Sequence, residues 1–212
     1  MRTMLLVVVM MLCAAVPVWC DGPIVTSRSD YFTVPNANIL GDRAIDLSVG
    51  SFGGGFVSSD NDNLFAVGLG FDSLEVTVNG SLDNFSSDQL IGSIKYQIDP
   101  GTIGVDGFGK TKAAIFVCNL GDSTSAVPGM AFTKSVFNGS DASVAVWNNE
   151  GWEIGGALQL FAGKYAAPTV EYSTESKLAL GVDLAYKGLY GRVVYLENSD
   201  EWYANVGQVI SW

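Results

Sequence analysis

The sequence contains no histidine. This absence excludes Ser-His-Asp catalysis, general-base chemistry by histidine and metal sites built on histidine. The barrel enzymes of bacterial outer membranes, among them lipases, acyltransferases and proteases, also rely on a histidine. We therefore expect a protein that is not an enzyme and that has no cofactor and no metal site.

Charged side chains are also scarce, at 16% of the chain, whereas 48% of the residues are hydrophobic. A typical soluble domain carries about 25% charged residues, so this chain has little charge for a solvated surface. Positively charged residues are the scarcer of the two kinds, with 11 Lys and Arg against 22 Asp and Glu. A net charge of -11 argues against a nucleic-acid partner and against docking on an anionic membrane leaflet.

Cysteine is nearly absent once the first twenty residues are set aside. Cys118 is then the only cysteine, so we expect no internal disulfide. Its neighbours Ile115, Phe116 and Val117 are apolar, which favours a packing role over a chemical one.

Long hydrophobic runs are limited to the N-terminus. Arg2 precedes an almost unbroken apolar stretch over residues 4–18, which is too short for a membrane-spanning helix of roughly 20 residues. The pattern predicts a secretory signal peptide over residues 1–20. No later stretch has 18 consecutive apolar residues, which excludes a helical inner-membrane protein.

What the sequence does contain is alternation of large apolar residues with small or polar ones, the period of a β-strand with two different faces. Such alternation is found over residues 44–52, 64–71, 74–79, 90–98, 152–160 and 177–186. Residues typical of turns separate these runs, at positions 58–63, 80–83, 99–101, 121–129, 138–141, 148–151 and 198–201. The spacing predicts an all-β domain of about 10 to 12 strands over residues 41–212. Residues 21–40 are less periodic and are expected to form an N-terminal tail or a short plug.

Two architectures fit these strands, a transmembrane barrel and a soluble β-sandwich. The polar faces are rich in Gly, Ala, Ser and Thr, as expected of a narrow lumen. Large aromatic residues lie near the strand ends, where the interface girdles of membrane barrels occur. We therefore predict an antiparallel, up-and-down transmembrane β-barrel, with a secreted sandwich that binds a surface ligand as the alternative.

The C-terminus adds a third argument for the barrel. Residues 203–212 alternate, and Val206, Ile210 and Trp212 share one face. A terminal aromatic on such a strand resembles the signal that the outer-membrane insertion machinery recognises. Gln208 is polar on the same face and departs from that pattern.

Eight charged residues are expected to point into the lumen. They are Asp46, Glu75, Lys95, Glu153, Glu171, Lys177, Asp183 and Arg192. Their mixed signs favour a charge-paired network, because buried charges need partners. A pair of carboxylates for glycoside hydrolysis is the weaker hypothesis, since no spacing selects two of them.

The run Val34-Pro35-Asn36-Ala37-Asn38-Ile39-Leu40, followed by a strand from Ile45, resembles the opening of YjbH-like outer-membrane proteins. Further similar motifs are 65–76, 94–96 and 170–172, together with the final hairpin. The resemblance implies an outer-membrane β-barrel, a link to surface polysaccharide and no catalytic residues. Together these patterns predict a non-enzymatic barrel in a bacterial outer membrane, structural or pore-like, whose partners are the lipid bilayer, the insertion machinery and a polysaccharide.

Overall fold

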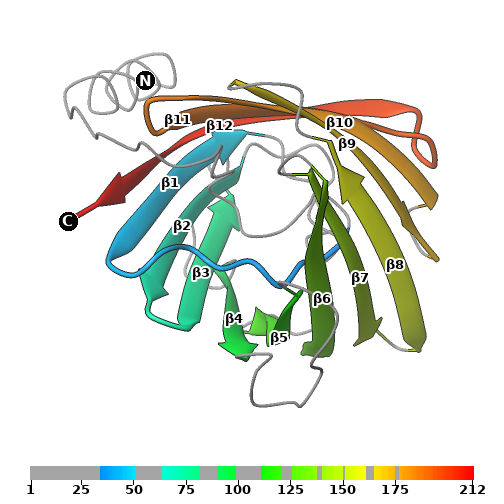
Figure 1. The fold of residues 1–212 in the computed structure, drawn as a ribbon, viewed down its shortest axis with the longest axis horizontal. Helices are drawn as coiled ribbons and strands as arrows, with labels where there is room; N and C mark the ends of the chain where they lie inside the picture. The colour runs from blue at the N-terminus through cyan, green and yellow to red at the C-terminus, as the bar shows by residue number, and fades with distance from the viewer. Residues whose placement is uncertain are drawn as a thin grey trace.

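Twelve antiparallel strands close into a single barrel (Figure 1). The computed structural model describes residues 34–50, 64–81, 90–98, 111–120, 126–137, 140–149, 151–160, 165–174 and 177–212. The strands are β1 Ala44–Gly50, β2 Leu64–Phe71, β3 Leu74–Ser81, β4 Ile91–Ile98, β5 Thr111–Leu120, β6 Val127–Phe137, β7 Ser140–Asn148, β8 Trp152–Gln159, β9 Ala166–Ser173, β10 Lys177–Tyr186, β11 Leu189–Leu196 and β12 Glu201–Ser211. The predicted signal peptide and residues 21–33 lie outside the described residues.

Each strand pairs with its neighbours in sequence, and β1 closes the barrel by pairing with β12. Because the number of strands is even, both ends of the wall lie at one rim, where Ala44 faces Ser211. The β10–β11 hairpin has a turn of only two residues. Between β10 and β11, Lys187 and Gly188 both have positive φ, 49° and 79°, as two-residue hairpin turns of the primed type require.

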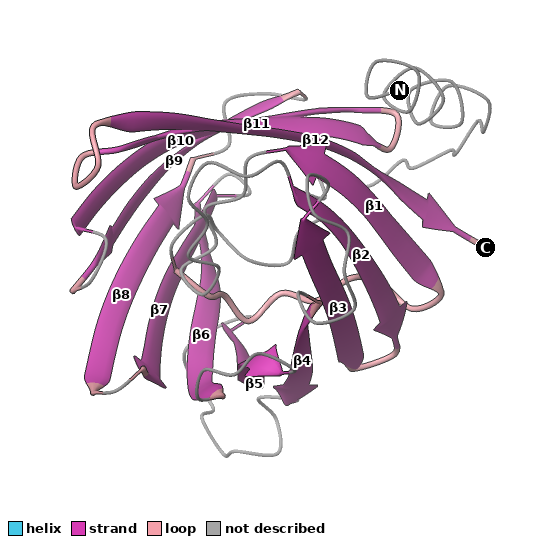
Figure 2. Cartoon of the chain, turned by 180° about the vertical axis from the view of Figure 1, so that it is seen from behind, coloured by secondary structure: helices cyan, strands magenta, loops and turns pink. Residues whose placement is uncertain are grey.

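The barrel prediction is confirmed, at the upper end of the expected strand number, and the sandwich alternative is wrong because one sheet closes on itself. Figure 2 shows only strands and loops among the described residues. In that part of the chain, no helix has the length and apolar character needed to cross a membrane.

Parts of two predicted turns, 80–83 and 121–129, are in fact strand. β3 continues through Gly80 and Ser81, and β6 already begins at Val127. Glycine was interpreted there as a break in the strand, but Gly80 faces Phe65 across the β2–β3 ladder. A β-carbon at Gly80 would lie 2.7 Å from the Phe65 ring, so the glycine makes room for an aromatic side chain instead of ending the strand.

The same arrangement recurs at two other ladders. Gly129 of β6 faces Phe116 of β5, and Gly207 of β12 faces Tyr190 of β11. A β-carbon at either glycine would lie 2.3 Å from an atom of the facing aromatic side chain. Aromatic side chains thus cover the glycines that would otherwise weaken these strands.

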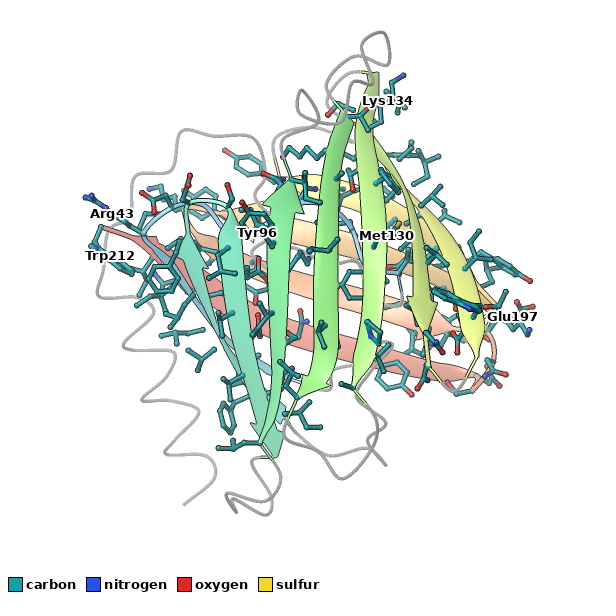
Figure 3. The ribbon with its side chains drawn as sticks, turned by 90° about the horizontal axis from the view of Figure 1, so that it is seen from below. Arg43, Tyr96, Met130, Lys134, Glu197 and Trp212 are labelled. Atoms are coloured by element: carbon teal, nitrogen blue, oxygen red, sulfur yellow. The ribbon has the colours of Figure 1, made fainter. Side chains whose placement is uncertain are left out.

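The outer face of the wall is apolar. Its exposed side chains include Ile94, Ile115, Met130, Phe132, Val144, Ile154, Val170, Leu180, Val182, Leu184 and Val193. Figure 3 shows Met130 on this face, at mid-height of the wall. Along β10 the exposed residues alternate with buried Ala179 and Asp183, as the period of two predicts.

Exposed aromatic side chains form two girdles, one at each rim. At the rim where the even-numbered strands end lie Phe71, Tyr96, Tyr165, Tyr186 and Trp212. At the opposite rim lie Trp152, Tyr172 and Trp202. Two ring contacts connect neighbouring strands within the girdles, Tyr165 with Tyr186 at 5.6 Å and Tyr195 with Trp202 at 5.3 Å between centroids.

Candidate functional site: the lumen and its strap

Residues 34–40, here called the strap, lie inside the barrel and belong to no strand. In Figure 1 the strap is the blue segment that crosses the lumen before the chain enters β1. Val34 and Ala37 are completely buried and Leu40 is 2% exposed. Since β1 begins at Ala44 and closes the barrel without the strap, the strap occupies the lumen but does not build the wall.

Two carboxylates hold the ends of the strap. The backbone N–H of Val34 donates to Oε2 of Glu171 on β9 at 3.1 Å. The N–H of Leu40 donates to Oε2 of Glu75 on β3 at 2.7 Å. Both carboxylates are buried, and hydrogen bonds to an ionised acceptor are stronger than neutral ones.

The middle of the strap is held by uncharged side chains. The N–H of Ala37 donates to Oγ1 of Thr133 at 2.8 Å, and the carbonyl of Ala37 accepts from Nε2 of Gln97 at 2.7 Å. Thr133 also shares a 2.7 Å hydrogen bond with Ser143. The buried backbone groups of Ala37 are therefore satisfied, although no strand pairs with it.

Asn38 is the point at which basic side chains reach the strap. Nζ of Lys95 donates to the Asn38 carbonyl at 3.2 Å, and Nζ of Lys112 donates to its side-chain Oδ1 at 2.8 Å. The N–H of Asn38 donates back to Oδ1 of Asn36 at 2.8 Å. The wall thus offers acceptors to the strap's N–H groups and donors to its oxygens.

The strap also packs on an apolar part of the lumen wall, formed by β5 to β8. Its buried members are Ala114, Phe116, Cys118, Val127, Ala131, Ala145, Trp147 and Ala157, and Val34 and Ala37 complete the cluster. Cys118 is buried in this cluster and forms no disulfide within the described residues, in agreement with its predicted packing role.

Three wall glycines make room for the strap. A β-carbon at Gly155 would lie 2.9 Å from Cγ2 of Val34, and one at Gly68 would lie 2.8 Å from Cδ1 of Leu40. At Gly70 a β-carbon would come within 2.2 Å of the Gly41 carbonyl oxygen. Any side chain at Gly70 would therefore displace the backbone that follows the strap.

The other side of the lumen is polar. Arg192 forms a bidentate ion pair with Asp183, through Nε with Oδ1 and through Nη2 with Oδ2, the latter at 3.1 Å. Nε2 of Gln159 donates to the same Oδ2 at 2.7 Å. Nearby on β1, Asp46 accepts a hydrogen bond from the hydroxyl of Tyr190 at 3.2 Å.

The structure places the eight predicted lumen residues in different roles. Asp183 and Arg192 pair with each other, whereas Glu75, Glu171 and Lys95 bind the strap. Glu153 is half-buried, and its Oε2 has no hydrogen-bond partner among the described residues.

Lys177 does not reach the interior. It lies at the rim, at the first position of β10, where it is exposed and donates to the Thr174 carbonyl at 2.7 Å. Its position in the alternation is inward, but a long side chain at a strand end extends into solvent.

Sequence reasoning did not find the uncharged residues that hold the strap, namely Thr133, Gln97 and the wall glycines. Their alternation gives the face on which they lie, but nothing local indicates that a distant segment binds them. The motif Val34-Pro35-Asn36-Ala37-Asn38-Ile39-Leu40 was noted for its resemblance to YjbH-like proteins and as part of a segment expected to form an N-terminal tail or a short plug, but neither expectation indicated which wall residues bind it.

At the C-terminus, Val206 and Trp212 are exposed, Ile210 is half-buried, and Gln208 is buried. The N–H of Trp212 donates to the Arg43 carbonyl at 3.2 Å, which ties the end of β12 to the turn before β1. These contacts describe the terminal strand but do not test its recognition by the insertion machinery, which stays a prediction.

The fully buried charges of the described chain are four acidic residues and two basic ones. They are Asp46, Glu75, Glu171 and Asp183 against Lys95 and Arg192, an excess of two negative charges. Among the described residues, no group of three or more His, Cys, Asp or Glu side chains is arranged to hold a metal ion.

No protein-family model and no curated protein matches the chain. Solved structures with a similar fold include the KdgM porin, at 13% identity and a TM-score of 0.50, covering 80% of this chain and 99% of that one. KdgM in complex with disordered oligogalacturonate aligns with 12% identity and a TM-score of 0.49 over the same shares. The NanC porin aligns with 9% identity and a TM-score of 0.46, over 79% of this chain and 99% of that one. At these identities the likeness is one of fold, and the chain has the barrel fold of the KdgM porin.

Proposed function

We propose that the protein is a non-enzymatic β-barrel of a bacterial outer membrane, with a narrow lumen for small polar solutes. The observation that carries this proposal is the apolar outer belt bounded by two aromatic girdles. Soluble monomers rarely expose continuous apolar patches beyond a few hundred Å². In a bilayer the same belt contacts lipid tails, and the girdles lie at the two interfaces.

The acidic lumen determines which solutes would pass. Four buried carboxylates against two buried cations favour cations and neutral polar molecules over anions, because a narrow passage of low dielectric strengthens the field of its lining charges. A neutral saccharide fits such a lumen better than a polyanionic one. The link to surface polysaccharide, membership of the YjbH-like family and use of the insertion machinery belong to this proposal and rest on the sequence motifs.

The carboxylates support a passage better than they support catalysis. Glu75 and Glu171 accept hydrogen bonds from the strap, and Asp183 is bound by Arg192. A hydrolytic pair needs one protonated acid and one free carboxylate on opposite sides of a substrate. Because these three carboxylates are already engaged in structural contacts, they favour a non-enzymatic function.

The membrane location is tested by fractionation. We expect the expressed protein to remain with outer membranes after a carbonate wash, and to migrate differently on gels before and after boiling, because a closed barrel resists detergent until it is heated. Release into the soluble fraction by carbonate would contradict the proposal. A secreted soluble protein expressed in parallel serves as the control for the wash.

The lumen charge is tested by ion selectivity in planar bilayers. We expect currents with a preference for potassium over chloride, and we expect Asp46→Asn to lower that preference because it removes one buried negative charge. The control is Asp42→Asn, since Asp42 is 60% exposed outside the wall. A preference for chloride in the unaltered protein would contradict the acidic passage.

A further inference from the structure

The strap interacts with the lumen as a ligand interacts with a binding site. It is extended, carries no charged residue and pairs with no strand. Its main chain is recognised by side chains of β3, β4, β6 and β9, through Glu75, Lys95, Gln97, Thr133 and Glu171. Because the β1–β12 ladder closes the barrel without it, the wall remains complete when the strap leaves.

The fit at the two ends of the strap is specific. Val34 packs against Gly155, and Leu40 packs against Gly68. Each of these apolar residues also donates its N–H to a buried carboxylate, Val34 to Glu171 and Leu40 to Glu75. The site therefore selects an extended uncharged segment with an apolar residue at each end, and it disfavours a carboxylate at either end.

We infer that the lumen contains a binding site for an extended, uncharged peptide, and that the chain's own strap occupies this site and narrows the passage. The role of the strap in narrowing the passage rests on the proposed function, whereas the peptide site stands on the contacts alone. A strap bound by side chains can leave and return without breaking a strand ladder. The tether gives it a high effective concentration at its site, so the bound state dominates until the strap itself is weakened.

The experiment weakens the strap while it leaves the wall unchanged. In the full chain, Val34→Asp combined with Leu40→Asp puts a carboxylate beside Glu171 and another beside Glu75, so like charges expel the strap. The matched control is Asn38→Asp, which adds the same type of charge to the strap but places it beside Lys95 and Lys112. Heat-modifiable migration establishes that each variant is folded.

Two readouts are made on these proteins in lipid. We expect the double variant to conduct several-fold more current than the parent, and the Asn38→Asp control to conduct like the parent. A capped synthetic peptide of sequence VPNANIL, supplied as a separate molecule, should bind the double variant, as measured by fluorescence anisotropy. The same peptide should return the current of the double variant to the parental level. The peptide DPNANID should do neither.

A second variant covers the case in which the double variant does not fold. Because a β-carbon at Gly155 would lie 2.9 Å from Val34 Cγ2, Val34→Cys with Gly155→Cys can form a disulfide in a Cys118→Ser background. The same background carries Leu40→Asp alone, which weakens the strap beside Glu75, so the reduced form leaves the site open to the peptide. Oxidation should then abolish binding of the labelled peptide and reduction should restore it, with each single-cysteine variant as the control.

The outcomes separate the two proposals. If peptide binding changes as expected but no variant conducts, the pore is wrong and the peptide site stands. If the folded double variant binds no peptide and conducts like the parent, or if the locked and reduced forms of the cysteine pair behave identically in both readouts, the inference is overturned.

Discussion

Replacing Arg192 by leucine is expected to lower the free energy of unfolding by about 3–5 kcal/mol, the usual cost of removing one partner of a buried ion pair. Asp183 is 3% exposed and receives two contacts from Arg192. After the substitution, only Gln159 among its described hydrogen-bond donors remains, so a buried carboxylate is left largely uncompensated. The measurement is a urea titration of the protein in lipid vesicles. At each urea concentration, the folded fraction is the fraction of protein that shows heat-modifiable migration on gels.

An exposed ion pair provides the control for Arg192. Arg43 lies 3.7 Å from Asp42, and both side chains are more than half exposed. Arg43→Leu should therefore change the free energy of unfolding by less than about 1 kcal/mol. Substituting leucine for both Asp183 and Arg192 should recover much of the loss, because no buried charge is then left unpaired. A cost below about 1 kcal/mol for Arg192→Leu would show that the pair does not contribute to stability.

Arginine at position 182 is expected to destabilise the barrel by about 2–4 kcal/mol, if the outer belt contacts lipid at mid-depth. Val182 lies on the outer face at the middle of β10, between Pro168 and Val193 on the neighbouring strands. An arginine there must extend its side chain toward an interface or remain in the hydrocarbon region. The same urea titration in vesicles measures the cost.

The control for Val182→Arg lies on the same strand and the same face but at a different depth. Tyr186 ends β10 in the aromatic girdle and is 53% exposed, so Tyr186→Arg should cost only about 0–1 kcal/mol. A soluble barrel would tolerate arginine at both positions equally. Equal costs at positions 182 and 186 would therefore contradict a lipid-facing belt.

Much of the wall could be predicted because strand alternation is a local property. Consecutive side chains of a strand point to opposite faces, so the sequence places Leu180 and Val182 outward and Asp183 inward without knowledge of any partner. The observed bounds of β2, Leu64–Phe71, coincide with the predicted strand. The prediction was wrong where glycine was interpreted as a turn, at Gly80 and around Gly129, because aromatic residues on the neighbouring strands occupy the space that these glycines leave.

The contents of the lumen could not be predicted in the same way, because they depend on long-range register. Val34 and the Glu171 carboxylate that binds it are 137 positions apart, and only closure of the barrel brings them together. The pairing of Asp183 with Arg192 likewise depends on the β10–β11 register, in which the two residues face each other. A list of inward charges did not indicate which of them pair and which hold the strap.

By itself, the sequence determined that the chain forms two-faced strands with an apolar outer side and a small, polar inner side. It did so because side-chain alternation and the scarcity of charge need no tertiary contact to be recognised. Only the tertiary structure decided that twelve strands close and that residues 34–40 lie across the lumen. Closure and occupancy arise from contacts between segments far apart in the chain, and the alternation is compatible with several strand numbers and several occupants.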